Sequence, residues 1–292
     1  MKNLNTKWIY LIILSIIWGS SFILIKKSLL GLTPYQLGAL RTIITGVILL
    51  SFGFKRLKSI PKSKWKWLLI SGLLGSFIPS FFFAIAETEI DSAVVSILNS
   101  LVPLNTILFG FAVFKITSTK QQVLGVIIGF IGTAILILKG AELNPNQNYL
   151  YAGFVIASTV MYAANVNIVK RYLQDVKPLA IAAGNYVFIL IPAIIVLLFT
   201  DFFTSERFNN PNLPSALLYI TILSVFGTAL AKVVFFKLVQ ISTPVFASSV
   251  TYIMPIVALI WGIIDGEAFS LLQGLAALLI LFGVYLANKR KA

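Results

Sequence analysis

Long apolar runs, each close to the length needed to cross a lipid bilayer, recur along the whole chain. A helix needs roughly 20 residues to cross about 30 Å of hydrocarbon. We therefore expect ten transmembrane helices, at Trp8–Ile25, Gln36–Phe54, Trp65–Ala86, Ser92–Phe114, Gln121–Leu138, Tyr149–Val169, Leu179–Thr200, Pro214–Phe236, Pro244–Ile264 and Phe269–Asn288. The connections between them are too short for a soluble domain. The sequence thus predicts an all-α membrane protein.

The composition agrees with lipid as the solvent for most of the chain. Of the 292 residues, 59% are hydrophobic and 11% are charged. Soluble domains are closer to about 45–50% apolar and about 25% charged. A net charge of +14 would suggest a nucleic-acid partner in a soluble protein. Here the basic residues lie in short connections between apolar runs, so we expect a lipid bilayer and no nucleic acid as partner.

The distribution of basic residues predicts the orientation of the chain. If the N-terminus is cytoplasmic, 17 of the 23 Lys and Arg residues fall in cytoplasmic segments and four fall in outer segments. Such a bias is typical of helical inner-membrane proteins, and it fits an even number of spans. We therefore expect a multi-pass protein of the bacterial inner membrane with both termini in the cytoplasm.

The two halves of the chain repeat each other. Matching residues keep their order over five spans, and their offset changes only across loops. Among the matching pairs are Trp18 and Tyr162, Ser21 and Asn165, Lys26 and Lys170, Gly75 and Gly227, Phe83 and Phe235, Ser96 and Ser248, and Pro103 and Pro255. We expect residues 1–140 and 149–289 to form two similar five-helix repeats.

An odd number of spans in each half has a geometric consequence. The second half must enter the membrane from the opposite side, so the two repeats are inverted about an axis in the membrane plane. This arrangement recurs in secondary transporters, where the substrate site lies near the midplane between the repeats.

Short motifs in both halves carry a family resemblance. They are Trp18-Gly19-Ser20-Ser21-Phe22, Arg41, Pro103, Val250-Thr251-Tyr252-Ile253-Met254-Pro255, Gly266-Glu267, Gln273-Gly274 and Leu281-Phe282-Gly283-Val284. With these motifs, the ten spans and the repeat, the chain resembles the EamA-type family of the drug/metabolite transporter superfamily. The resemblance implies a ten-helix permease with a central cavity lined by spans 1–4 and 6–9. It also implies metabolite substrates, amino acids among them, that are often exported.

Helical spacing places polar residues of several spans on single faces, and these faces should point inward because an unpaired polar group in lipid costs free energy. The candidate cavity residues are Trp18, Ser21, Arg41, Ser80, Ser96, Asn99, Tyr162, Asn165, Asn185, Lys232, Ser248 and Thr251. For the serines and threonine, helix packing is the alternative role. An asparagine side chain has four hydrogen-bonding sites, which also fits the lining of a wet cavity.

Arg41 and Lys232 are the two basic residues that lie several residues inside the end of a span. Charges inside a membrane tend to face the bundle interior or a water-filled path. Both could serve as an electrostatic handle for a carboxylate or as part of a gate. Because both lie near an interface, extension of the side chain towards the headgroups remains an alternative. Asn185 occupies the position that matches Arg41 in the second half, so the charge is not symmetric.

Proline and glycine mark further positions within spans. Pro103 and Pro255 match each other, and each removes a backbone donor, so they are either hinges of alternating access or static kinks. Gly125 and Gly129 form a Gly-x-x-x-Gly motif, which allows close helix contact within the chain or between protomers.

Several function classes lack the residues they need. The chain has no Cys and no His, and no pair of acidic residues lies within a span, so we expect no enzyme, metal site or cofactor. Four-helix multidrug relatives carry an essential glutamate in their first helix, and this chain has none there. We therefore expect a secondary transporter that moves, and exports, a small zwitterionic or anionic metabolite such as an amino acid. A non-transporting membrane metabolite sensor or an assembly factor is the alternative.

Overall fold

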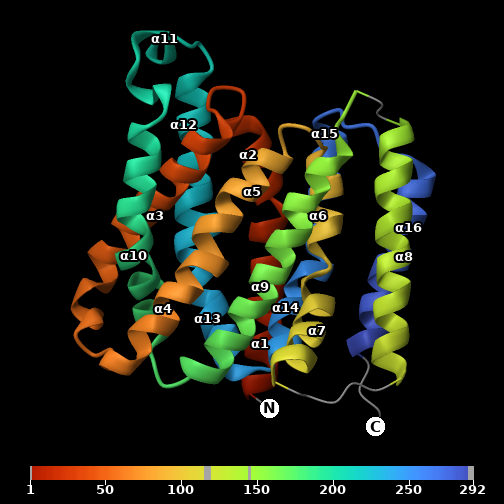
Figure 1. The fold of residues 1–292 in the computed structure, drawn as a ribbon, viewed down its shortest axis with the longest axis horizontal. Coiled ribbons are helices and arrows are strands. Elements are labelled where there is room, and N and C mark those ends of the chain that lie inside the picture. Colours follow the sequence, from red (N-terminus) through yellow and green to blue (C-terminus); the bar gives the residue numbers. More distant parts are fainter. Residues whose placement is uncertain (1, 115–119, 144–145, 289–292) are drawn as a thin grey trace.

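A computed structural model describes residues 2–114, 120–143 and 146–288. Its regular elements are all helices, and no strand occurs in these ranges (Figure 1). The α-helices are α1 (Lys2–Gly19), α2 (Ser21–Ser28), α3 (Pro34–Leu57), α4 (Trp65–Gly72), α5 (Ile78–Ala86), α6 (Ser92–Asn99), α7 (Val102–Phe114), α8 (Lys120–Leu143), α9 (Ala152–Tyr172), α10 (Pro178–Leu198), α11 (Ser205–Phe208), α12 (Leu213–Ile222), α13 (Ala231–Ile241), α14 (Pro244–Ser248), α15 (Met254–Ile264) and α16 (Leu271–Asn288). Short π- or 3₁₀-helical segments are η1 (Lys62–Lys64), η2 (Leu73–Phe77), η3 (Tyr149–Tyr151), η4 (Asp201–Phe203), η5 (Leu223–Leu230) and η6 (Ser249–Tyr252).

Eight segments of the described chain are long and apolar enough to cross a membrane. They are Thr6–Ser28, Pro34–Leu57, Lys62–Ala86, Ser92–Val113, Tyr149–Tyr172, Pro178–Leu198, Leu213–Ile241 and Pro244–Ile264. The expected fifth and tenth spans fall on α8 and α16, whose apolar parts, Val123–Lys139 and Leu271–Gly283, are shorter. Four residues that enter the charge bias, Lys115, Lys289, Arg290 and Lys291, lie outside the described residues.

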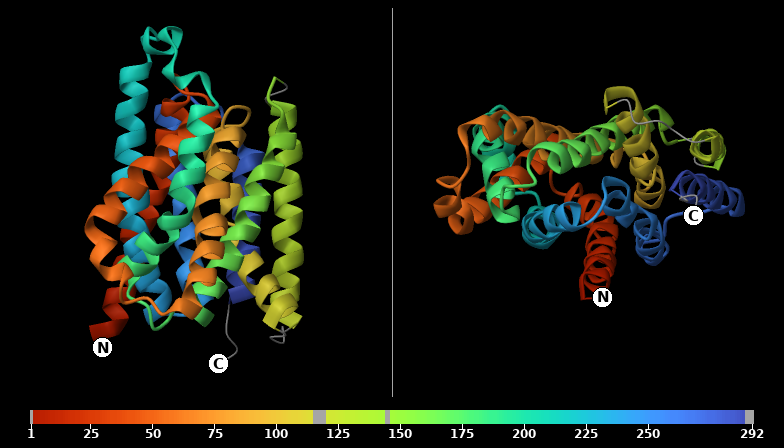
Figure 2. Two further views of the ribbon diagram at one scale, coloured as in Figure 1. Left: turned by 60° about the vertical axis from the view of Figure 1, so that its left-hand side comes forward. Right: turned by 90° about the horizontal axis from the view of Figure 1, so that it is seen from below.

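Helices from the two halves of the chain pack against each other in matched pairs. Helix α3 lies along α10, α6 lies against α15, and α8 lies along α16. Viewed from the end, α8 and α16 stand side by side at one edge of the molecule (Figure 2). The start of α1 and the end of α16 lie at the same end of the bundle, and we call the opposite end the outer end (Figures 1 and 2).

Glycine brings α8 and α16 into direct backbone contact. A Cβ atom added to Gly283 would lie 2.5 Å from the backbone nitrogen of Gly129 and 2.7 Å from the carbonyl oxygen of Gly125. Such distances leave no room for a side chain at Gly283. The Gly-x-x-x-Gly motif therefore serves a contact within the chain.

Two spans at equivalent places of the two halves are broken. The span that begins at Ser92 breaks between α6 and α7, directly before Pro103, and the span that begins at Pro244 breaks at η6, directly before Pro255. Proline cannot donate to the carbonyl four residues earlier, so each break frees the carbonyl of a cavity residue, Asn99 or Thr251. A partner helix satisfies part of the second break, since Ser15 donates to the carbonyl oxygen of Val250 at 2.8 Å.

The third and eighth spans each contain a π-helical segment, η2 and η5. The two segments hold the matched glycines Gly75 and Gly227, so the distortion occurs at the same place in both halves. A π-helical turn widens the hydrogen-bonded ring, and such turns are frequent at functional sites. Neither segment is visible in the apolar pattern of the sequence.

Large apolar side chains are exposed on the outside of the bundle. Phe52, Ile191 and Ile16 expose 77%, 64% and 52% of their surface. Exposed apolar surface of this extent requires a partner, and lipid tails supply it. The polar groups that the sequence placed within spans lie mainly on the opposite, inner side of the helices, among them Ser96, Asn165 and Thr228, which are all buried.

Candidate functional site

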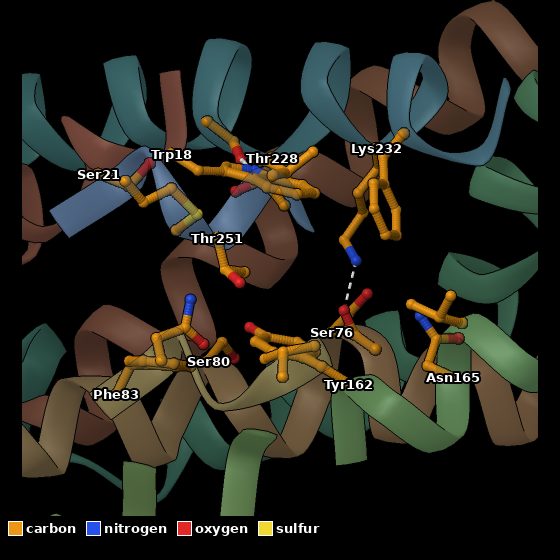
Figure 3. A pocket seen from close by; sticks show the side chains of 18 of the residues that line it. Trp18, Ser21, Ser76, Ser80, Phe83, Tyr162, Asn165, Thr228, Lys232 and Thr251 are labelled. Carbon is orange, nitrogen blue, oxygen red and sulfur yellow. Dashed lines mark hydrogen bonds between the residues drawn. The ribbon is translucent and has the colours of Figure 1, made fainter. Parts of the chain in front are cut away.

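A cavity of about 950 Å³, including its open part, lies between the two halves of the chain. In Figure 3, Trp18, Ser21, Thr228 and Thr251 lie along one wall, and Ser80, Phe83, Tyr162 and Asn165 lie along the facing wall. The described residues that line it are Trp18, Ser21, Phe22, Ile25, Arg41, Thr42, Gly75, Ser76, Ser80, Phe83, Asn99, Val102, Tyr162, Asn165, Val166, Tyr186, Gly227, Thr228, Lys232, Phe235, Ala247, Ser248, Val250, Thr251 and Met254. They come from eight of the ten expected spans, and α8 and α16 contribute none.

Ten of the twelve candidate residues lie in this wall, and Ser96 and Asn185 do not. Ser96 is fully buried, and its Oγ atom has no hydrogen-bond partner. Asn185 lies on α10 and is buried against α4, with its side-chain amide 3.1 Å from the hydroxyl of Ser71. Ser71 in turn donates to Asn165 at 2.6 Å, so Asn185 supports a cavity residue from behind.

The cavity contains two basic side chains and no acidic one among its described lining residues. The Arg41 guanidinium donates through Nε to the hydroxyl of Thr228 at 3.0 Å. Lys232 is 9% exposed, and its ammonium group donates to the carbonyl oxygen of Gly75 (Figure 3). Each cation thus contacts a neutral oxygen of a π-helical segment. Because a buried charge is costly without a counter-charge, this cavity favours an anionic group in its ligand.

The two π-helical segments receive equivalent contacts from the other half. A Cβ atom added to Gly75 would lie 2.4 Å from Asn165 Nδ2, and one added to Gly227 would lie 2.8 Å from Ser21 Oγ. Asn165 and Ser21 occupy matching positions of the repeat, as do the two glycines. The cavity is therefore built around two similar corners, in each of which a backbone without a side chain meets a polar side chain.

Aromatic rings form the apolar part of the wall. Trp18 donates through its indole nitrogen to the carbonyl oxygen of Gly227 at 2.8 Å, and its ring meets the edge of Phe235 at a centroid distance of 5.0 Å. On the facing wall, Phe83 stacks with Tyr162 at 5.9 Å. An organic ligand could therefore contact flat apolar surfaces on both sides.

Among the described wall residues, Asn99 has a buried side-chain oxygen without a hydrogen-bond partner. Buried polar atoms in proteins are normally paired, so unpaired atoms in a cavity wall indicate contact with a ligand or water. The side-chain oxygen of Asn99 is an acceptor and fits a donor such as an ammonium group.

Several residues of the cavity wall are not among the twelve candidates from the sequence. The largest buried side chain among them is that of Tyr186, which is 1% exposed. Its neighbour Asn185 is a candidate because it matches Arg41 in the repeat, but that match contains no signal for Tyr186. Ser76 and Thr228 share faces with Ser80 and Lys232, so the spacing contained the signal for these two.

A network of charged residues joins the ends of several spans at the outer end of the bundle. The carboxylate of Glu267 accepts from Lys26 at 2.9 Å, from the hydroxyl of Ser92 at 2.6 Å and from the backbone nitrogen of Ala93 at 3.1 Å. A carboxylate at the N-terminus of α6 is favourable because the helix dipole is positive there. Lys26 also binds Asp265 at 2.9 Å. The contacts join the ends of spans from both halves.

The turn that positions Glu267 depends on glycine. Gly266 has a φ angle of +82°, which side chains rarely allow. A Cβ atom at Gly262 would lie 2.6 Å from the Glu267 carboxylate. Burial favours a raised pKa for Asp265 in the same turn, but hydrogen bonds from Lys27 and Lys26 outweigh burial and lower it.

A second polar network lies at the opposite end. Lys170, which matches Lys26 in the repeat, donates to the carbonyl oxygens of Val239, Gln240 and Ser242 at 3.2, 3.2 and 2.6 Å. These carbonyls belong to the C-terminal end of α13, where a cation is favourable. The side-chain nitrogen of Gln240 also donates to the carbonyl oxygen of Val176 at 2.7 Å. The matched lysines thus tie opposite ends of the bundle.

The sequence model of the EamA-like transporter family matches residues 6–138 and, a second time, residues 150–289. The chain belongs to the EamA-like transporter family. Relatives of this EamA-like chain include the uncharacterized inner membrane transporter YedA of Escherichia coli K12, with 26% identity over 95% of this chain and 89% of YedA. An uncharacterized transporter of Archaeoglobus fulgidus is 26% identical over 98% of this chain and 99% of its own length. Protein PecM of Dickeya dadantii is 27% identical over 94% of this chain and 92% of its own.

A solved crystal structure has the same fold as this EamA-like chain. It aligns over 97% of this chain and 96% of its own, with a TM-score of 0.65 and 17% sequence identity. At this identity the likeness concerns the fold alone. Family membership and the apolar helices make this EamA-like chain a multi-pass membrane transporter.

Proposed function

We propose that this EamA-like protein is a secondary transporter that moves a small carboxylate-bearing metabolite, such as an amino acid, by alternating access. The observation that carries the proposal is the pair of cations, Arg41 and Lys232, in a cavity without an acidic lining residue in the described chain. Export is the direction that the family resemblance of the sequence implies. An anionic group between the two cations supplies the missing counter-charge.

The polar groups of the cavity wall favour a zwitterionic ligand over a simple anion. The unpaired side-chain oxygen of Asn99 can accept from an ammonium group. The aromatic walls at Trp18 and Phe83 fit an apolar side chain. Carboxylate, ammonium and apolar side chain would then each contact a different part of the wall.

We infer that the chain forms ten spans arranged as two inverted repeats, each a five-helix unit over 1–140 or 149–289. The two ranges that match the family model, 6–138 and 150–289, lie within these units. Helices α1 and α9, the first long helices of the two halves, run in opposite directions (Figure 1). Inversion also explains why matched residues, Lys26 and Lys170, make polar contacts at opposite ends. The 17-to-4 charge bias supports cytoplasmic termini.

Alternating access requires that each end can open while the other is closed. The two polar networks, at Glu267 and at Lys170, are the contacts that must break in turn. The broken spans at Pro103 and Pro255 supply backbone joints next to the cavity. We propose that these prolines act as hinges rather than static kinks.

Flux of labelled amino acids and organic acids into proteoliposomes tests this function. Lys232→Met removes the charge but keeps the length of the side chain, so we expect the protein to fold and flux to fall at least about tenfold. Lys237→Met is the matched control because Lys237 lies on the same helix and is exposed. We expect Asn99→Ala to weaken transport of amino acids more than of simple organic anions. Wild-type flux in well-folded Lys232→Met would contradict the site.

A metabolite sensor is the alternative function, since it could bind a ligand in the same cavity. Direct binding to detergent-purified protein, measured beside flux, distinguishes the two. Binding that depends on Lys232 without any flux would favour the sensor.

A further inference from the structure

We propose that Glu87 is a proton-binding site that controls the outer gate, and that protonation of Glu87 holds the contacts of this gate together. The inference rests on the proposed function only in taking the cavity as the path that this gate closes. The outer gate is the network of Glu267, Lys26, Asp265 and Ser92. The ligand of the new site is a proton.

Glu87 is buried where a carboxylate is unfavourable. It follows α5 directly after the span ends at Ala86, and only 7% of its surface is exposed. Neither of its carboxylate oxygens has a well-formed hydrogen bond. The residue caps the C-terminal end of α5, where the helix dipole is negative and repels an anion. A neutral carboxylic acid fits this environment, and an anion does not.

The charged groups around Glu87 come from three other elements. Burial raises its pKa well above the usual range, and the nearby carboxylate of Glu267 raises it further. Arg41 on α3 and Lys26 on α2, including the Lys26 backbone, lower it by less. Helix α9 also packs against α5, but its basic residues, Lys170 and Arg171, lie in its last turn, at the end away from Glu87. The balance at this position therefore favours the protonated acid.

Lys26 connects this acid to the gate. In the closed gate Lys26 binds Glu267 and Asp265, each at 2.9 Å, and it also interacts electrostatically with Glu87. If the proton of Glu87 passes to water at the outer end, the new carboxylate competes with Glu267 for the Lys26 ammonium. Glu267 then loses its cation, and its hold on the N-terminus of α6 weakens. Removal of one proton thus exchanges the partner of Lys26 and loosens the gate.

The sign of the pH dependence follows from this exchange. The closed state holds Glu87 with a raised pKa, whereas an open outer end exposes it to water and returns the pKa towards its usual range. A group with the higher pKa in the closed state stabilises that state at low pH, and the stabilisation is lost as the pH rises through that value. Rising outer pH should therefore open the outer gate.

The absence of cysteine from the sequence allows a direct test with a single reporter. Ser80→Cys places a thiol in the cavity wall, and a membrane-impermeant thiol reagent is applied from the outer side between about pH 5 and about pH 8. The thiolate fraction itself rises with pH, so the readout is the labelling rate divided by that of the same reporter with Glu87→Gln. Glu87→Met serves as a second uncharged variant in case Gln is poorly folded.

We expect this ratio to rise at least about fivefold with pH. The matched control is Glu89→Gln, two residues away and partly exposed, which should keep the pH dependence of the parent. A ratio that stays flat with either uncharged variant would overturn the proton site. Amino-acid flux is measured in the parent chain without the reporter, so a flat ratio with normal flux would reject the proton site and leave the transporter standing. A rising ratio without flux would support the proton site and reject the transporter.

Discussion

Single glycine residues determine how closely the two halves of the chain approach each other at the cavity. Gly75 meets Asn165, and Gly227 meets Ser21, with no space for a methyl group at either glycine. Both glycines lie in π-helical segments whose carbonyls accept from Lys232 and Trp18. A substitution at either glycine thus acts on packing and on the ligand-binding side chains together.

We predict that Gly75→Ala and Gly227→Ala each lower flux, with a stability loss of about 1–3 kcal/mol from overpacking. Gly75→Ala should be the more severe because its Cβ atom would approach a neighbour at 2.4 Å, against 2.8 Å for Gly227→Ala. Thermal unfolding in detergent and flux in proteoliposomes measure the two effects. Gly153→Ala is the control, because an added Cβ atom at Gly153 has no neighbour within 4 Å. Equal flux in all three variants would contradict the close contacts at Gly75 and Gly227.

At the level of elements, the interrupted spans are the feature most relevant to movement. The breaks before Pro103 and Pro255 place short helices, α6 and α14, on one side of each break and longer ones on the other. Breaks of this kind in membranes occur where the backbone lines a cavity or is buried in protein. Here both interruptions adjoin cavity residues, Asn99 and Thr251.

We predict that Pro103→Ala and Pro255→Ala lower the turnover rate by about threefold to tenfold while substrate affinity changes little. Alanine restores a backbone donor and favours a continuous helix, which stiffens the joint. Flux at saturating substrate, compared with equilibrium binding, separates turnover from affinity. Pro34→Ala is the control because Pro34 starts α3, where proline is normal. Unchanged turnover in both variants would assign the prolines to static kinks.

Apolar runs located the helices well because span length depends mainly on the thickness of the bilayer. The family and the eight long spans agree with what the runs predicted. The runs could not predict η2 and η5, because a π-helical turn follows from tertiary contacts and leaves the apolar pattern intact. Spacing also identified polar faces on several spans, but not the rotation of those faces. Asn185 shows this limit, since it points to α4 while its neighbour Tyr186 lines the cavity.

At the level of the whole molecule, a matched pair of lysines makes polar contacts at opposite ends of the bundle. Lys26 binds carboxylates at the outer end, and Lys170 binds backbone carbonyls at the end that holds the termini. The two contacts use different partners, so the repeat has kept the position of the lysine while changing its chemistry. The outer contact is an ion pair and should respond to salt and pH, whereas the inner contact caps the end of a helix.

The most direct test of the account measures access to the cavity from each side. The reporter is Ser80→Cys in a chain without other cysteines, labelled from either face of sealed vesicles, with Lys26→Met or Lys170→Met added. Alternating access between inverted repeats predicts opposite shifts: Lys26→Met raises labelling from the outer face and lowers it from the other, and Lys170→Met does the reverse. A shift in the same direction for both variants, or no shift in either, would contradict the account.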